Sequence, residues 1–236
     1  DLDVNPREPG GVSFTREFLD NAATLFIPLL IMGVGSDIVS SERTSGTVKM
    51  LLTRPVRRWK VLLSKLITLM MFVSLIIVST CVICYFISGL FFGYRGWTMP
   101  VFTGFQLRGA EVDISGVHAV PQWLYIFMQA GLIWFVSVVV AALAFMVSVL
   151  VRSTSASIVI MMATLIAGNI LTNMASSWTS AKYLFMVNLG LTNYLAGTPA
   201  PIEGMTLGFS LAVLAIWGLC ALVVSFLVFT KQDILN

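Results

Sequence analysis

The chain has 236 residues, of which 58% are hydrophobic and only 11% are charged, whereas soluble domains have about 25% charged residues. Its mean hydropathy is +0.93. These values exclude a soluble globular protein, because a water-exposed surface needs charged groups and only small apolar patches. The composition instead predicts a polytopic membrane protein, an all-α helix bundle whose solvent is lipid.

Five apolar runs are long enough to cross a bilayer, which takes about 20 helical residues. In chain order they are 18–39, 61–92, 122–151, 157–175 and 206–229. The first run is the weakest, because Asp20, Asn21 and Asp37 leave a short apolar middle and Pro28 lies inside it. The second and third runs exceed what a bilayer needs, so we expect them to tilt or to extend beyond the headgroups.

Basic residues accumulate between the first and second spans, which predicts that this connection is cytoplasmic. Alternation of the spans then places nine of the 14 basic residues and the C-terminus on the same side. Eight of the 11 acidic residues fall on the other side. Five spans with a cytoplasmic C-terminus put Asp1 outside, so we expect a sixth span upstream of Asp1.

The connection between the first two spans, residues 41–66, reads SERTSGTVKMLLTRPVRRWKVLLSKL. Its apolar residues recur at steps of three and four, which indicates an amphipathic helix with a basic second face. Gly46 lets the chain turn after the first span, and Pro55 should kink the helix because it lacks an amide donor. Such a segment lies at the cytoplasmic interface. A plainer interpretation is a basic anchor whose pattern is the second span beginning early.

The order of residues in this connection resembles the signature of ABC-2-type permeases, the membrane subunits of ABC exporters. The matching positions are Glu42, Gly46, Thr47, Leu51, Leu52, Pro55, Arg57 and Lys65. The resemblance implies that segment 41–60 holds a coupling helix that docks on a separate cytosolic ABC ATPase. It also implies that ATP and Mg belong to that partner, with no cofactor on this chain. The residues it assigns to ATPase coupling are Glu42, Gly46, Thr47, Leu51, Leu52, Pro55, Arg57 and Arg58.

Residues 176–205 are apolar but interrupted by asparagine, glycine and proline. Such a segment is too broken to span and too apolar for a solvated loop, so we expect a re-entrant or interfacial element on the outer side. ABC-2-type permeases usually carry short membrane-embedded helices in this place. The chain is thus expected to form a single transmembrane domain over residues 1–236.

No catalytic or metal site is predicted. The sequence contains neither a GxxxxGK[ST] phosphate loop nor an HExxH motif, and His118 is its only histidine. Trp59 is the one aromatic residue of the basic connection and is better explained as an interface anchor than as a base-stacking platform. Enzymatic activity of this chain alone and nucleic-acid binding are therefore not expected.

Polar residues inside the spans are the candidates for a substrate pathway. Asn169, Thr172 and Asn173 project from one side of the fourth span, and Gln129 lies in the third. They either line a substrate route or form hydrogen bonds between helices, which are worth about 0.6 kcal/mol each in membranes.

The resemblance predicts a permease subunit of an ATP-driven exporter in a bacterial cytoplasmic membrane, working by alternating access as a dimer with a second or homologous permease. Two alternatives stay open: an ATP-independent homo-oligomeric channel or secondary carrier, and a membrane anchor or sensor for an ATPase. A secondary carrier should show acidic residues near the bilayer midplane and repeated halves with broken helices. The sequence leaves the substrate open.

Overall fold

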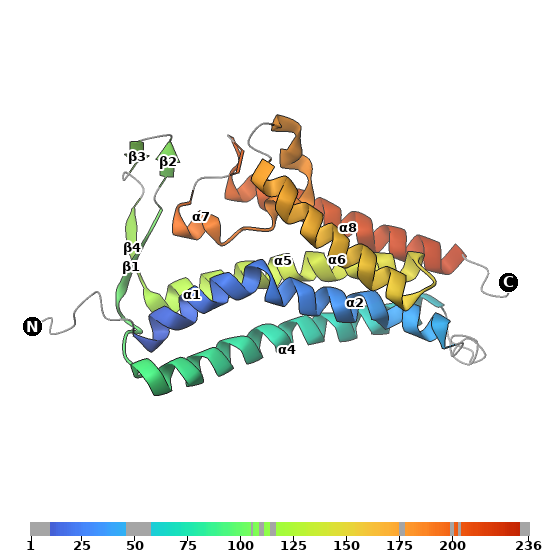
Figure 1. The fold of residues 1–236 in the computed structure, drawn as a ribbon, viewed down its shortest axis with the longest axis horizontal. Helices are drawn as coiled ribbons and strands as arrows, with labels where there is room; N and C mark the ends of the chain where they lie inside the picture. Colours follow the sequence, from blue (N-terminus) through green and yellow to red (C-terminus); the bar gives the residue numbers. More distant parts are fainter. Residues whose placement is uncertain are drawn as a thin grey trace, which may run out of the picture.

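A computed structural model describes residues 10–45, 58–104, 106–108, 111–113, 117–174, 178–198, 201–202 and 204–231. Most of them belong to long helices that run side by side in an elongated bundle (Figure 1). The helices are α1 (Gly11–Thr24), α2 (Phe26–Thr44), α4 (Arg58–Phe92), α5 (Gln122–Leu150), α6 (Thr154–Met174) and α8 (Leu207–Lys231). Within the described ranges four helices are long and apolar enough to cross a membrane, or five if α1 and α2 form one bent span. The predicted membrane helix bundle is confirmed at this level.

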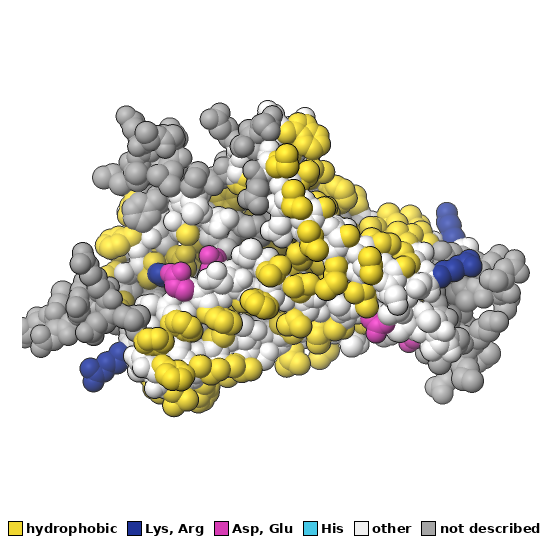
Figure 2. All heavy atoms as spheres, in the orientation of Figure 1, with side chains coloured by type: hydrophobic (Ala, Val, Ile, Leu, Met, Phe, Trp, Pro, Cys, Tyr) yellow, Lys and Arg dark blue, Asp and Glu magenta, His cyan; other side chains and the backbone are white. Residues whose placement is uncertain are grey.

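The two ends of the bundle differ in charge and in structure. The start of α1, the end of α4 and the start of α5 meet at one end, next to a β-hairpin (Figure 1). We call this the hairpin end. Lysine and arginine side chains gather at the opposite end (Figure 2), where α2 ends and α4 begins. We call it the basic end, and it carries Lys60, Lys65, Arg152 and Lys231.

Helix α5 lies at the centre of the bundle and is the most buried of the long helices. It packs most extensively against α2 and α8. Its sequence explains this position, because the run Val139–Ala144 has small or β-branched side chains at every position except Leu143, and these let neighbouring backbones come close. At the α2 crossing, a Cβ atom added to Gly35 would lie 2.8 Å from the Cβ of Ala144. Glycine at position 35 is what permits this approach.

The first predicted span is two helices rather than one. Helices α1 and α2 meet at Leu25 with a bend of 44°. The physical reason is Pro28, which has no amide hydrogen to donate to the carbonyl of Thr24 and whose ring crowds that carbonyl. The helical pair also exceeds the predicted range of 18–39 at both ends, since it begins at Gly11 and ends at Thr44.

The segment between α4 and α5 departs from the all-α prediction. Strand β1 (Pro100–Thr103) pairs antiparallel with β4 (His118–Pro121), and β2 (Gln106–Arg108) pairs with β3 (Glu111–Asp113). The hairpin projects from the bundle (Figure 1). Strands of three or four residues are too short to leave a clear period-two pattern in the sequence. His118 is exposed on this hairpin.

The interrupted segment before α8 forms short helical turns that fold beside α6 and α8 (Figure 1). They are η2 (Thr179–Tyr183), η3 (Phe185–Asn188) and α7 (Asn193–Ala196). Trp217 of α8 donates its indole N–H to the Tyr183 carbonyl over 2.9 Å. The hydroxyl oxygens of Tyr194 and Ser210 lie 2.9 Å apart. These two contacts fasten the irregular segment to α8.

Candidate functional site

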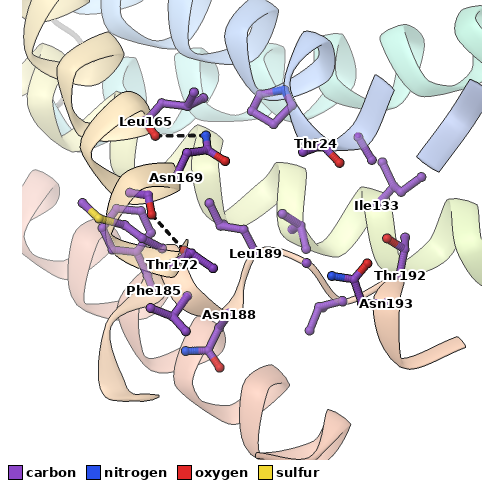
Figure 3. A pocket seen from close by; sticks show the side chains of 18 of the residues that line it. Thr24, Ile133, Leu165, Asn169, Thr172, Phe185, Asn188, Leu189, Thr192 and Asn193 are labelled. Carbon is purple, nitrogen blue, oxygen red and sulfur yellow. Dashed lines mark hydrogen bonds between the residues drawn. The ribbon is translucent and has the colours of Figure 1, made fainter. Parts of the chain in front are cut away.

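A cavity of about 160 Å³ opens where the α1–α2 junction, α5, α6 and residues 185–201 meet (Figure 3). One water molecule needs about 10–15 Å³ on the same scale, so the cavity holds several waters or part of a small organic molecule. Apolar side chains such as Met32, Ile133 and Val136 form much of its wall. The described lining contains no charged side chain, and its polar members are Thr24, Ser137, Thr164, Asn169, Thr172, Asn188, Thr192, Asn193 and Thr198.

Helix α6 presents one face to this cavity. Its lining residues Leu165, Gly168, Asn169 and Thr172 follow steps of three and four, so they fall on one side of the helix. Asn169 donates to the carbonyl of Leu165 over 3.2 Å, and Thr172 donates to that of Gly168 over 2.8 Å (Figure 3). The Thr172 hydroxyl thereby satisfies a carbonyl of its own helix and can still accept a hydrogen bond from a guest.

Glycine at position 168 brings the opposite wall close. A Cβ atom added there would lie 3.0 Å from the Cβ of Met186, which belongs to η3. Asn188 belongs to the same wall. It is 1% exposed and donates to the carbonyls of Lys182 and Leu184 over 2.9 and 2.8 Å. These bonds hold the turns of η2 and η3 together, and so fix the shape of this side of the cavity.

The structure separates the four residues predicted for the substrate pathway. Asn169 and Thr172 line the cavity. Asn173 lies in α6, and its side chain is outside the described part of the chain. Gln129 is not among the lining residues. It is 2% exposed and donates to the carbonyl of Arg16 over 3.2 Å, so it joins α5 to α1 instead.

Sequence reasoning missed the residues on the other side of the cavity, Thr24, Asn188, Thr192 and Asn193. Thr24 enters the lining because the helix breaks next to it. The asparagines belong to the interrupted segment, where they were noted only as helix breakers. The signal that could have identified these four residues is that each is a polar residue within an otherwise apolar stretch of the sequence.

A second candidate region lies at the basic end, where α2 and α4 flank the predicted coupling segment. Lys65 of α4 bridges to the Glu42 carboxylate of α2 at 2.6 Å and donates to the Ile38 carbonyl at 2.6 Å. The side chain of Lys65 is 13% exposed and that of Glu42 is 32% exposed. This double contact ties the end of one helix to the start of the next.

Most of the residues assigned to ATPase coupling lie outside the described residues. These are Gly46, Thr47, Leu51, Leu52, Pro55 and Arg57. Arg58 begins α4, and its side chain is outside the described part as well. Glu42 is the member of the set whose side-chain contact the structure gives, and that contact is with Lys65.

Helix α2 is also fixed to α5 and approaches α6 at the basic end. The Ser148 hydroxyl of α5 accepts the backbone N–H groups of Val39 and Ser40, each over 3.0 Å. The hydroxyl oxygens of Thr44 and Thr154 lie 3.4 Å apart. Displacement of the end of α2 would therefore act on three neighbouring helices.

We expect Lys65→Met to destabilise the protein by about 1–3 kcal/mol, because it leaves a half-buried carboxylate and a carbonyl without their cationic partner. Lys60→Met is the matched control, since Lys60 is exposed and its described contact is with the ring of its neighbour Trp59. Thermal unfolding of both variants in one detergent measures the difference. Equal melting temperatures would show that the Glu42–Lys65 pair contributes nothing to stability.

Comparison with known proteins places the chain in a family. Residues 5–235 match the model of a family described as "Protein of unknown function (DUF2705)". "Uncharacterized protein YhcI" of Bacillus subtilis strain 168 is 32% identical over 215 residues, covering 90% of this chain and 66% of the relative. "Uncharacterized membrane protein YdbK" of the same strain is 29% identical over 212 residues, covering 89% and 78%. This chain is a membrane protein that belongs to the DUF2705 family.

Proposed function

We propose that this chain is a permease subunit of an ATP-driven ABC exporter, acting with a second permease copy on cytosolic ATPase subunits. The observation that carries the proposal is the ion pair between the two helices on either side of segment 46–57. This segment has the residue order of an ABC-2-type coupling element, and the Glu42–Lys65 pair joins the two helices that flank it. A force applied to the segment would therefore pass directly into α2 and α4.

The charge distribution supports an orientation with the basic end in the cytoplasm of a bacterial cell. In this arrangement the bent α1–α2 pair, α4, α5, α6 and α8 are five spans, and the C-terminus is cytoplasmic. The hairpin and the turns η2, η3 and α7 then face outward. Under this assignment, alternation of the five spans puts the end of α2, the start of α4, the start of α6 and the end of α8 on one side. The basic residues near these helix ends favour the same side.

Helix α2 connects the proposed coupling segment to the cavity. Its Pro28 and Met32 line the cavity, while Glu42 near its other end pairs with Lys65. A helix transmits displacement along its length, so a movement of the coupling segment would alter the cavity wall. We propose that ATP-driven closure of the partner subunits uses this connection to alternate the access of the cavity between the two sides.

The test is purification of the full-length protein from its own membranes in mild detergent, followed by mass spectrometry of what co-purifies in stoichiometric amount. We expect a cytosolic subunit with a GxxxxGK[ST] phosphate loop. Recovery of this chain alone, as a stable oligomer that does not respond to ATP, would favour an ATP-independent channel or carrier. A bound ATPase without substrate flux in proteoliposomes would identify an anchor or sensor.

A further inference from the structure

Helix α1 has an unusual surface for a membrane helix. Val12, Thr15, Leu19 and Ala22 are buried against the bundle. The opposite side carries the polar residues Arg16, Glu17, Asp20, Asn21 and Thr24. Figure 2 shows both signs of charge over α1 on the face drawn. These side chains require protein, water or a ligand beside them, because lipid cannot solvate them.

These polar residues of α1, which we call the α1 stripe, extend from the hairpin end toward the middle of the bundle. The carbonyl of Arg16 accepts from Gln129, which is six residues along α5 from the half-exposed Trp123. Six helical residues correspond to about 9 Å. A half-exposed tryptophan at the end of an apolar helix is typical of the membrane–water interface, which we assign to the level of Trp123. Asp20 lies one turn of α1 further inward, at a depth where a carboxylate marks a pathway or a binding site more often than a surface.

The two acidic residues of the stripe differ in their partners. Glu17 is neutralised by Arg16 at 2.6 Å, and the Arg16 guanidinium also lies over the Tyr125 ring, 5.5 Å from its centroid. Asp20 makes no ion pair with any residue in the described ranges. Its backbone carbonyl accepts the Thr24 hydroxyl over 3.1 Å, a bond that does not involve the carboxylate. The stripe therefore carries one uncompensated negative charge among the described residues.

Asp20 is not itself a lining residue, but it precedes two lining residues along α1. Ala23 and Thr24, which follow Asp20 within one turn of α1, belong to the cavity lining. Beyond them the lining is uncharged, with apolar walls and scattered hydroxyl and amide groups. No group of three or more metal-ligating side chains occurs in the part of the chain that the structure describes, so a bound metal ion is not what the arrangement favours. A carboxylate about one helical turn from an apolar, uncharged cavity suits a molecule with a cationic head and an apolar body.

We propose that the exported substrate is a cationic amphiphile, whose ammonium or guanidinium group pairs with Asp20 while its apolar part enters the cavity. This inference rests on the permease function proposed above and names the substrate class of that same cavity. The uncharged lining then accepts the apolar part without any requirement for a second charge.

The test measures binding of radiolabelled phenyltrimethylammonium to the full-length protein in nanodiscs, with its uncharged isostere tert-butylbenzene as competitor. We expect saturable binding that weakens by at least about tenfold in Asp20→Asn, because the charge partner is lost. Asp20→Glu should retain affinity within about threefold, since it keeps the charge. In the wild type, we expect tert-butylbenzene to compete at least about tenfold more weakly than unlabelled phenyltrimethylammonium, because it lacks the positive charge.

Asp37→Asn is the matched control, because it makes the same substitution in α2, beyond the lining on the side of the basic end rather than in the α1 stripe. It should bind phenyltrimethylammonium like the wild type. Gel filtration and thermal unfolding confirm that each variant is folded. Equal affinity of the wild type and Asp20→Asn, or no saturable binding at all, would overturn the proposal.

The binding experiment tests the substrate class independently of the co-purification experiment, which tests the ATP-driven function. If an ATPase co-purifies but phenyltrimethylammonium does not bind, the exporter stands and the substrate class is wrong. If the cation binds in an Asp20-dependent manner and no ATPase is found, the binding site stands and the ATP-driven function is wrong.

Discussion

Gly35→Leu should prevent α2 from packing on α5 and yield a protein that no longer folds into the bundle. A Cβ atom at this position already meets the Cβ of Ala144 at 2.8 Å, and it would lie 3.7 Å from Leu69. Ala144 is fully buried and cannot rotate away, so the whole helix has to move. Overpacking by a few methylenes costs about 1–3 kcal/mol, and a leucine side chain here should reach or exceed the top of that range.

Gly33→Leu provides the control for this prediction. Gly33 lies two residues away in the same helix, and an added Cβ atom meets nothing within 4 Å. The two variants change helix propensity equally, so any difference between them reports the contact with α5. Yield of monodisperse protein and melting temperature in one detergent are the measurements. Similar behaviour of the two variants would show that the α2–α5 crossing tolerates separation.

Leu51→Asp should abolish transport and stimulation of the partner ATPase while membrane insertion stays intact. Leu51 lies outside the described residues, and the sequence pattern with its resemblance to ABC-2-type permeases assigns its role. In that pattern Leu51 belongs to the apolar face of the segment, which would fill a cleft on the ATPase. A carboxylate there would have to be desolvated against an apolar surface, which costs several kcal/mol without a partner charge.

Thr53→Asp is the matched control, because it introduces the same charge on the predicted basic face of the segment. We expect it to keep most of the transport activity. ATP hydrolysis by the purified complex and substrate uptake into inverted vesicles measure both variants, with gel filtration reporting the assembly. Undiminished transport by Leu51→Asp would remove the coupling role of this segment.

Long apolar runs predicted α4, α5, α6 and α8 well, because a membrane helix needs little besides length and hydrophobicity. The same rule could not place the break between α1 and α2. Pro28 was recognised as a disturbance, but its effect falls four residues earlier, at the carbonyl that it leaves without a donor. The hairpin was missed because its strands owe their pairing to each other rather than to a local pattern.

The cavity was predictable only on the α6 side. Asn169 and Thr172 were found because helical spacing puts them on one face. Asn188 and Asn193 reach the cavity through the packing of η3 on α6, and this packing depends on the absence of a side chain at Gly168. Gln129 was predicted for the substrate pathway because it is a polar residue inside a span. It instead donates to the Arg16 carbonyl of the neighbouring helix α1.

The bend at Leu25 joins two halves of the helical pair that are held to the bundle at different places. Helix α1 is held by the Thr15–Ser88 contact of 3.0 Å and by the bond from Gln129 to Arg16. Helix α2 is held instead by the Ser148 hydroxyl of α5 and by the Glu42–Lys65 pair. Because Pro28 cannot donate to the Thr24 carbonyl, that one helical hydrogen bond does not resist a change in the angle between the two halves. If α2 moves with α4 and α5 in the proposed transport cycle, this junction lets the cavity wall at Pro28 and Met32 shift while α1 stays in place.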